Sequence, residues 1–168
     1  LIVDKYGFDK VYKQGFTINT PLNLKLQEQA TISLRKGLIE FDKKKGWRGP
    51  LLNKKYNSDW TKNLEDFKLE KSIGWNLSII KKINRFSTEI ETIEGNKGII
   101  EFSSINWTKL DFEELFSVGD IVYTEKIKNN KYNLKQLPKV NGAILVMDPY
   151  TGRILALSGG FSFKNSEF

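Results

Sequence analysis

The sequence predicts an α+β fold that is mainly β, and three observations support this. Apolar residues recur every three or four positions over residues 21–45, which is the period of one face of a helix. Several short segments over residues 77–137 alternate apolar and polar side chains, as half-buried strands do. The stretch VNGAILVMDPYTGRILALSGGFSF at residues 140–163 has two apolar runs around a turn, which is typical of a hairpin.

The expected helix covers residues 21–45. Its apolar stripe has a spacing of four, four, four and three, and it consists of Leu26, Ala30, Leu34, Leu38 and Phe41. Thr20 and Pro21 favour the N-cap and the first helical position, and Gly46 favours a left-handed C-cap after three lysines. Before the helix, Phe16 and Ile18 alternate as in a short strand.

The middle of the chain predicts a small barrel. Residues 47–74 read as a loop, in which residues 59–70 favour a short helix, and Leu110–Phe116 favours a brief helix or turn. The five expected strands are Leu77–Ile80, Phe86–Ile93, Gly98–Phe102, Ile121–Ile127 and Tyr132–Leu137. Since no helical period among them is long enough for a parallel crossover, the strands favour a closed antiparallel five-stranded barrel. An OB-like barrel is the first interpretation, and an SH3-like barrel is the alternative.

The last apolar run, Gly142–Met147, is nearly continuous, so both of its faces are expected to be buried. A hairpin is not stable alone. Its expected partners are the strand near 16–18 and the apolar stripe of the helix. The barrel would then be an insertion between the helix and the hairpin.

Composition excludes several kinds of site. The 168 residues include no cysteine and no histidine, which rules out disulfides, thiolate metal sites and histidine-dependent acid–base pairs within this chain. The net charge of +7 makes nucleic acid a candidate partner, but the cations are 23 lysines against four arginines. Because specific readout of bases and phosphates favours arginine, a generic solvated surface is the preferred interpretation.

Motifs at both ends of the chain indicate a family. The segment GFTINTPLNLKLQEQATISLRKGLIEFDKKKGWRGP resembles the start of the penicillin-binding region of class A penicillin-binding proteins, through Leu26-Gln27, Phe41-Asp42 and residues 46–50. The stretch VNGAILVMDPYTGRILALSGGFSFKNSEF is similar to the hairpin that leads into the family's active-site segment. Residues 75–137 look like the OB-like domain inserted in the 1A type.

The resemblance implies a bifunctional, membrane-anchored peptidoglycan synthase. In this family a glycosyltransferase polymerises a lipid-linked disaccharide, and a D,D-transpeptidase cross-links the stem peptides. The transpeptidase nucleophile is the serine of a Ser-x-x-Lys motif shortly after the Gly-Gly-Phe-x-Phe segment. We therefore expect a non-catalytic piece of a longer protein: 1–46 as linker strand and helix of the transpeptidase region, 47–138 as the OB-like inserted domain, and 139–168 as the hairpin leading towards the active site.

The resemblance also implies a cellular location and binding partners for the parent enzyme. The parent enzyme, a penicillin target in cell-wall synthesis, is expected at the periplasmic face of the inner membrane, anchored by a segment outside this chain. The barrel is expected to act as a docking or spacing domain, next to other modules of the parent enzyme. A periplasmic or outer-membrane regulator protein and peptidoglycan are candidate partners, and no nucleic acid is expected. The alternative is a free-standing OB-type module that binds single-stranded nucleic acid.

We expect no catalytic, cofactor-binding or metal-binding residue in this chain. Ser33 with Lys36 and Ser78 with Lys81 match Ser-x-x-Lys, but so short a spacing rule is expected to match by chance. The carboxylate pairs Glu89/Glu91 and Glu113/Glu114 are expected to form solvated salt bridges rather than acid–base pairs. Seven aromatic residues are candidates for a stacking surface: Trp47, Trp60, Trp75, Trp107, Tyr56, Tyr123 and Tyr132. Of these, Trp47 and Trp107 are expected in core or interface positions.

Overall fold

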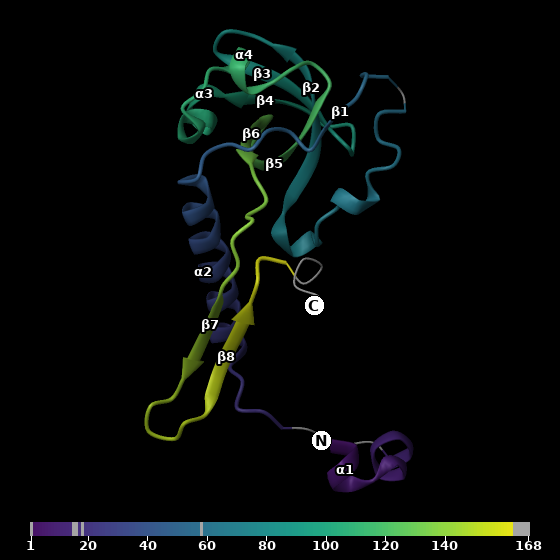
Figure 1. Ribbon diagram of the computed structural model, residues 1–168, viewed down its shortest axis with the longest axis vertical. Coiled ribbons are helices and arrows are strands. Elements are labelled where there is room, and N and C mark those ends of the chain that lie inside the picture. The colour runs from purple at the N-terminus through teal and green to yellow at the C-terminus, as the bar shows by residue number, and fades with distance from the viewer. Residues whose placement is uncertain (1, 15–16, 18, 58, 163–168) are drawn as a thin grey trace.

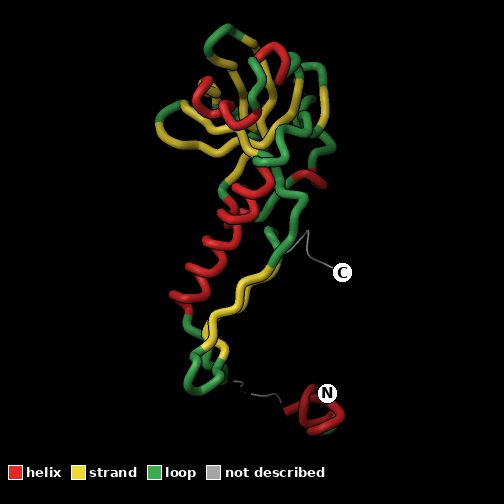
Figure 2. The backbone as a smooth tube through the Cα atoms, turned by 60° about the vertical axis from the view of Figure 1, so that its left-hand side comes forward, coloured by secondary structure: helices red, strands yellow, loops and turns green. Residues whose placement is uncertain are grey.

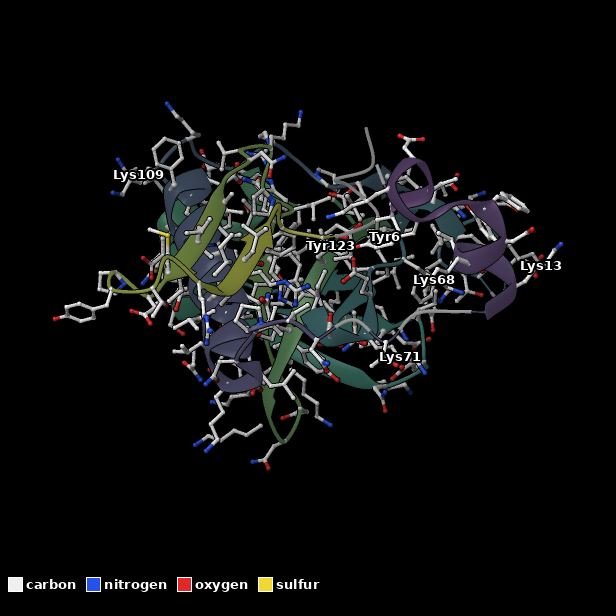
Figure 3. The ribbon with its side chains drawn as sticks, turned by 90° about the horizontal axis from the view of Figure 1, so that it is seen from below. Tyr6, Lys13, Lys68, Lys71, Lys109 and Tyr123 are labelled. Carbon is white, nitrogen blue, oxygen red and sulfur yellow. The ribbon has the colours of Figure 1, made fainter. Side chains whose placement is uncertain are left out.

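The computed structural model describes residues 2–14, 17, 19–57 and 59–162. A β-barrel forms one end of the molecule, and helix α2 (Leu24–Lys43) and the hairpin of β7 (Ala143–Met147) and β8 (Ile154–Gly159) extend from it (Figure 1). Helix α1 (Ile2–Tyr6) and a single π-helical turn, Lys10–Gln14, lie at the opposite end. Figure 3 shows Lys13 projecting outwards from these N-terminal turns.

The barrel has five strands that close on themselves. They are β2 (Trp75–Ile83), β3 (Ser87–Thr92), β4 (Lys97–Glu101), β5 (Asp120–Lys128) and β6 (Lys131–Lys135), paired in the order β5-β2-β3-β4-β6 with β6 returning to β5. The expected five strands and OB-like barrel are confirmed. A short strand β1 (Leu52–Asn53) pairs with the start of β5, where β6 does not reach.

One pairing departs from the expected antiparallel barrel. Strands β4 and β6 are parallel, with Ile99 opposite Lys131 and Ile100 opposite Tyr132. A ring with an odd number of strands cannot alternate direction all the way round, so closure of five strands requires at least one parallel pair. The expected antiparallel five-stranded barrel therefore contains one parallel pair, at this seam.

The interior of the barrel is apolar. Its core cluster consists of Ile80, Ile90, Ile100, Ile105, Phe112, Leu115, Phe116, Val122, Tyr132 and Leu134. Helices α3 (Phe102–Ile105) and α4 (Phe112–Leu115), with a 3₁₀ turn at Asn106–Thr108 between them, lie between β4 and β5 and supply several of these side chains. The expected helix at Leu110–Phe116 is confirmed as α4, whereas α3 was not predicted.

A second cluster lies on the outer face of β2 and β5, beneath the loop at 54–74. It consists of Trp60, Leu64, Leu77, Ile79, Ile121 and Tyr123. Instead of the short helix expected at 59–70, the loop forms two single 3₁₀ turns, Glu65–Phe67 and Lys71–Ile73. Neighbouring strand residues point to opposite faces, so Ile80 enters the barrel and Ile79 lies under the loop, and both have 0% of their surface exposed.

Helix α2 begins three residues later than the cap at Thr20 predicts. Asn23 is the N-cap, and its side-chain oxygen accepts a hydrogen bond from the Leu26 amide at 3.1 Å. Gly46 adopts the expected left-handed conformation, with φ of 86°. The predicted apolar stripe fails at both ends, because Leu26 and Phe41 are 36% and 51% exposed, and Asp42, next to Phe41, is buried instead.

The hairpin lies along α2 with one face (Figure 2). On the face towards α2, Val146 is partly buried and its cross-strand partner Ala156 is fully buried. On the other face, the cross-strand partners Leu145 and Leu157 are 52% and 55% exposed. The prediction that both faces of Gly142–Met147 are buried was therefore wrong within the described residues. A single helix can cover only one face of a two-stranded sheet.

Candidate functional site

The hairpin edge is bound by the beginning of α2. The Gln27 side-chain amide donates to the Leu157 carbonyl at 2.9 Å and accepts from the Leu157 amide at 3.0 Å. The backbone amide of Asn23 donates a hydrogen bond to the Leu155 carbonyl at 2.8 Å. These contacts satisfy backbone groups that an edge strand would otherwise leave unpaired. Phe16 and Ile18, expected to pair with the hairpin, lie outside the described residues.

The junction between α2 and the barrel is built around the carboxylate of Asp42, which is 2% exposed. Arg48 Nη1 lies 2.9 Å from both carboxylate oxygens. Gln136 Nε2 donates to Oδ2 at 2.9 Å, and the Lys139 backbone amide donates to Oδ1 at 3.1 Å. One buried carboxylate thus binds both connections between the barrel and the helix–hairpin layer, the one that enters the barrel and the one that leaves it.

Arg48 and Gln136 complete this junction with contacts to the backbone. Arg48 Nη2 donates to the Leu137 carbonyl at 2.6 Å, and the Arg48 amide donates to Gln136 Oε1 at 2.9 Å. Gln136 Nε2 also donates to the Gly46 carbonyl at 3.1 Å. A buried charge is tolerated when it is paired and hydrogen-bonded, and each carboxylate oxygen of Asp42 has at least two donors. We call Asp42, Arg48 and Gln136 the crossover clamp.

A second junction joins the barrel to the segment after β8. Phe161 is 5% exposed and packs against the ring of Trp75, with ring centroids 5.2 Å apart. Arg35 Nε donates to the Phe161 carbonyl at 3.0 Å, and Arg35 Nη2 lies 3.3 Å from Glu70 Oε2. The hydroxyl of Ser162, a residue that is 2% exposed, donates to Glu70 Oε1 at 2.8 Å. Helix, barrel loop and post-hairpin segment therefore meet at one ion pair.

A cleft of about 470 Å³ opens beside this second junction, between α2 and the barrel. Its walls include the cations Arg35, Lys36, Lys43 and Lys135. Burial, and then the charge of Lys135, lower the pKa of Lys43 from its ordinary value. Lys135 itself lies 2.8 Å from Glu125 Oε2. The wall also carries Glu40 and Glu125, so the cations of the cleft are in part neutralised by carboxylates.

The two Ser-x-x-Lys matches lie in unrelated places. Ser33 is exposed in the middle of α2. Ser78 is fully buried in β2, where its hydroxyl lies 2.7 Å from the hydroxyl of Thr124 across the strand pair. Among the described residues of the segment after the hairpin, 160–162, no hydrogen bond to the side chain of Ser33 or Ser78 is present.

The carboxylates of β3 form the expected ion pairs on the barrel surface. Glu89 Oε1 lies 4.0 Å from Lys82 Nζ, and Glu91 Oε2 lies 3.0 Å from Lys81 Nζ. Tyr56 also donates to Glu91, at 2.9 Å. Burial alone would raise the pKa of Glu91, but the hydrogen bonds from Lys81 and Tyr56 outweigh it and lower that pKa. The hydrogen bond with Tyr56, followed by the one with Glu91, raises the pKa of Lys81.

The other carboxylate pair lies at the start of α4. Glu114 accepts a hydrogen bond from the Asp111 amide at 3.1 Å and completes a capping box, whereas Glu113 is exposed. Glu114 therefore stabilises the N-terminus of α4, and within residues 2–14, 17, 19–57 and 59–162 neither Glu113 nor Glu114 forms the expected salt bridge.

Most of the seven aromatic residues do not form a stacking surface, because their rings are packed into the molecule. Trp60, Tyr123 and Tyr132 are at most 4% exposed. Trp47 packs edge-on against Trp107 and Phe116 beside the barrel core, which confirms the expected core or interface position of both tryptophans. Burial raises the pKa of Tyr123 to about 12, and the Tyr123 hydroxyl donates to the Phe67 carbonyl at 2.7 Å. Among the seven, Tyr56 is the ring that is more than a third exposed.

Residues 2–14, 17, 19–57 and 59–162 contain no cluster of three or more acidic side chains that could hold a metal ion. Within the same ranges, no helix has the length and apolar character needed to cross a bilayer.

Sequence reasoning missed the functional meaning of Arg35, Glu70 and Gln136. A usable signal was present, because arginine is scarce in this lysine-rich chain and two of its four arginines, Arg35 and Arg48, lie at the two junctions. Arginine is favoured where a planar cation must make several hydrogen bonds at once.

Comparison with known proteins identifies the barrel. Residues 47–140 match the family "Penicillin-binding protein OB-like domain". The chain belongs to this family.

Relatives of the OB-like domain family extend the match beyond the barrel. The chain is 37% identical over 164 residues to "Penicillin-binding protein 1A" of Rickettsia prowazekii, a match that covers 95% of this chain and 21% of the relative. It is 26% identical to "Penicillin-binding protein 1A" of Pseudomonas aeruginosa, covering 99% of this chain and 22% of that protein. The resemblance to class A penicillin-binding proteins of the 1A type is thus confirmed.

A solved structure agrees with this assignment. The crystal structure of penicillin-binding protein 1A from Haemophilus influenzae superposes with a TM-score of 0.77 at 25% identity, over 99% of this chain and 25% of that chain. The chain spans about a fifth of the length of the curated relatives. The motif residues that carried the resemblance, Gln27, Asp42 and Arg48, bind the hairpin and the barrel to α2.

Proposed function

We propose that this chain is a non-catalytic part of a bifunctional peptidoglycan synthase with glycosyltransferase and D,D-transpeptidase activities. The single observation that carries the proposal is the match of nearly the whole chain, barrel and flanking motifs together, to 1A-type penicillin-binding proteins. The enzyme acts at the periplasmic face of the inner membrane, and its membrane anchor and catalytic residues lie outside residues 1–168. The nucleophilic serine follows the segment that leaves β8.

In this proposal the barrel is an inserted domain for docking or spacing. Its two connections meet at the crossover clamp, where the Lys139 amide lies 3.1 Å from Asp42 Oδ1. Adjacent entry and exit points are typical of a domain inserted into another without disturbing it. The barrel's partners are the neighbouring modules of the enzyme, together with a periplasmic or outer-membrane regulator or peptidoglycan itself.

Penicillin labelling tests the assignment. The full-length protein should form a covalent adduct with a fluorescent penicillin at a serine outside residues 1–168, and the 168-residue chain alone should form none. Ser33→Ala and Ser78→Ala variants of the full-length protein should label like the wild type. An adduct located at Ser33 or Ser78 by mass spectrometry, or an unlabelled full-length protein, contradicts the proposal.

Co-sedimentation tests the role of the barrel. If the barrel docks on glycan, the 168-residue chain should sediment together with purified peptidoglycan. If the chain stays in the supernatant, the role left for the barrel is docking of a regulator protein or spacing. A single-stranded oligonucleotide, titrated at two salt concentrations, is the matched control. Tight binding that weakens steeply with salt favours the nucleic-acid alternative.

A further inference from the structure

The three residues after β8 are held by three different parts of the molecule. The Gly160 amide donates to the Gly142 carbonyl at 2.8 Å, which continues the hairpin. The Phe161 carbonyl is bound by Arg35 of α2, and the Phe161 ring lies against Trp75 of the barrel. The Ser162 hydroxyl is bound by Glu70 of the barrel loop. Beyond Gly160 the hairpin no longer guides the chain, so side chains of the helix and barrel fix its path.

The two barrel residues that contact this segment, Trp75 and Glu70, lie at the start of strand β2 and just before it. Trp75 is the first residue of β2 and is in register with Glu125 of β5, so it belongs to the closed sheet. Glu70 precedes the 3₁₀ turn Lys71–Ile73, which ends at Gly74 in the left-handed conformation with φ of 71°. The Trp75 ring also packs against Tyr123, with centroids 6.1 Å apart. The contact surface therefore belongs to the start of β2 and to the turn directly before it.

Glu70 connects the helix and the segment through one carboxylate. Its Oε2 pairs with Arg35 at 3.3 Å, and its Oε1 accepts from Ser162 at 2.8 Å. The side chain of Arg35 is 20% exposed and that of Glu70 32%. A charge-assisted hydrogen bond in such a partly desolvated place is stronger and more directional than a surface ion pair.

We propose that Glu70 and Trp75 of the barrel are positioning residues for the transpeptidase reaction, because they hold Phe161 and Ser162 and so set how the chain leaves the hairpin. This inference rests on the proposed function, in which the nucleophile follows this segment. The barrel is then a support for the active-site segment in addition to a docking or spacing domain. Small displacements of a reacting group lower rates strongly, so a loosened support should slow acylation.

The test is the rate of acylation of the full-length protein by a fluorescent penicillin, measured with the thermal midpoint of the same samples. Glu70→Ala removes the ion pair with Arg35 and the hydrogen bonds that the carboxylate accepts from the hydroxyls of Ser162 and Ser72. Acylation should become about tenfold slower, the factor that one charge-assisted hydrogen bond typically contributes. The matched control is Glu65→Ala in the same loop, where Glu65 pairs with Lys68 at 2.7 Å and is 79% exposed. It should acylate at the wild-type rate.

A second variant separates positioning from folding. Ser162→Ala removes one hydroxyl, and its effect on acylation should not add to that of Glu70→Ala in the double variant if both act through the same contact. If Glu70→Ala lowers the thermal midpoint as well as the acylation rate, its slower acylation could come from unfolding, and the Ser162→Ala variant then decides between the two explanations. Slower acylation of Ser162→Ala supports the inference, and an unchanged acylation rate overturns it.

The outcomes distinguish the two proposals. A wild-type protein that is never acylated defeats the proposed function and this inference with it. A wild-type protein that is acylated, with Glu70→Ala and Ser162→Ala reacting equally fast, defeats the inference and leaves the proposed function standing.

Discussion

The barrel and the helix–hairpin layer contain similar apolar strands but bury them differently. In β2 the neighbours Ile79 and Ile80 are both fully buried, because the barrel interior takes one and the loop at 54–74 covers the other. In the hairpin, α2 covers one face, and Leu145 and Leu157 are left more than half exposed. The difference shows that an apolar run is buried on as many faces as there are layers to cover it.

The contacts that stabilise the barrel and the helix–hairpin layer also differ from those of the crossover clamp, which connects the two. The barrel is held by an apolar core, and the hairpin is also bound to α2 by the hydrogen bonds of Gln27, whereas the crossover clamp is an ionic and hydrogen-bonded network around a buried carboxylate. Polar networks are directional, so they fix an orientation that apolar contacts alone would leave loose. The following predictions test this contrast, from the largest expected effect to the smallest.

Asp42→Ala should have the largest effect. It leaves Arg48, Gln136 and the Lys139 amide without their shared acceptor, and removing one partner of a buried ion pair typically costs about 3–5 kcal/mol. The free energy of unfolding, measured with denaturant, checks this. Asp59→Ala is the control, because Asp59 and its partner Lys62 are 60% and 69% exposed, and it should cost less than about 1 kcal/mol. Equal effects would show that the clamp is no stronger than a surface pair.

Ile80→Ala compared with Leu145→Ala tests the difference in burial directly. The first opens a cavity inside the barrel and should lower the free energy of unfolding by about 2–5 kcal/mol. The second truncates a side chain that is 52% exposed, and it should cost less than about 1 kcal/mol. A large loss from Leu145→Ala in the isolated chain would mean that the exposed hairpin face is covered in solution.

Gln27→Ala tests how the hairpin edge is held. The variant loses two hydrogen bonds to the backbone of Leu157, each worth about 1 kcal/mol at most in an exposed position. Hydrogen exchange of the Leu157 amide should accelerate by roughly fivefold to tenfold, while amides of the barrel core keep their protection. Gln29→Ala, at an exposed position of the same helix, is the control and should leave the Leu157 amide unchanged.

Glu91→Gln should have the smallest effect, and one that depends on pH. Because the pKa of Glu91 is lowered in the folded protein, its carboxylate stabilises the fold above the ordinary value of 4.5, and this contribution is lost as pH falls through the lowered value. At neutral pH the variant should be destabilised by about 1 kcal/mol or less. Thermal midpoints of Glu91→Gln, recorded from pH 7 downwards, should converge with those of the wild type. Glu113→Gln, at an exposed position, is the control at pH 7 and should melt like the wild type. A constant gap at all pH values would contradict the assignment of the stabilisation to the carboxylate.

The sequence by itself determined the local elements. The helix period placed α2 to within a few residues, and the alternation of β2 to β6 gave five strands. In the turn between β7 and β8, the Asp148 side chain accepts a hydrogen bond from the Tyr150 backbone amide at 2.9 Å, and Gly152 has a positive φ of 69°. Aspartate and glycine are the residue types that favour these two turn conformations. Such features depend on a few neighbouring residues, so they can be read from a single sequence.

Only the tertiary structure decided how those elements are joined. The parallel seam of β4 and β6 follows from closing an odd ring, which no strand reveals alone. Local periodicity assigned Phe41 to the buried face of α2, but Asp42 is buried there instead. Glu70 and Ser162 are far apart in the chain, and only the fold brings them into hydrogen-bond contact. Polar contacts of this kind depend on where separate elements meet, because a hydrogen bond requires two particular atoms within about 3 Å, and the sequence spacing of distant residues carries no such distance.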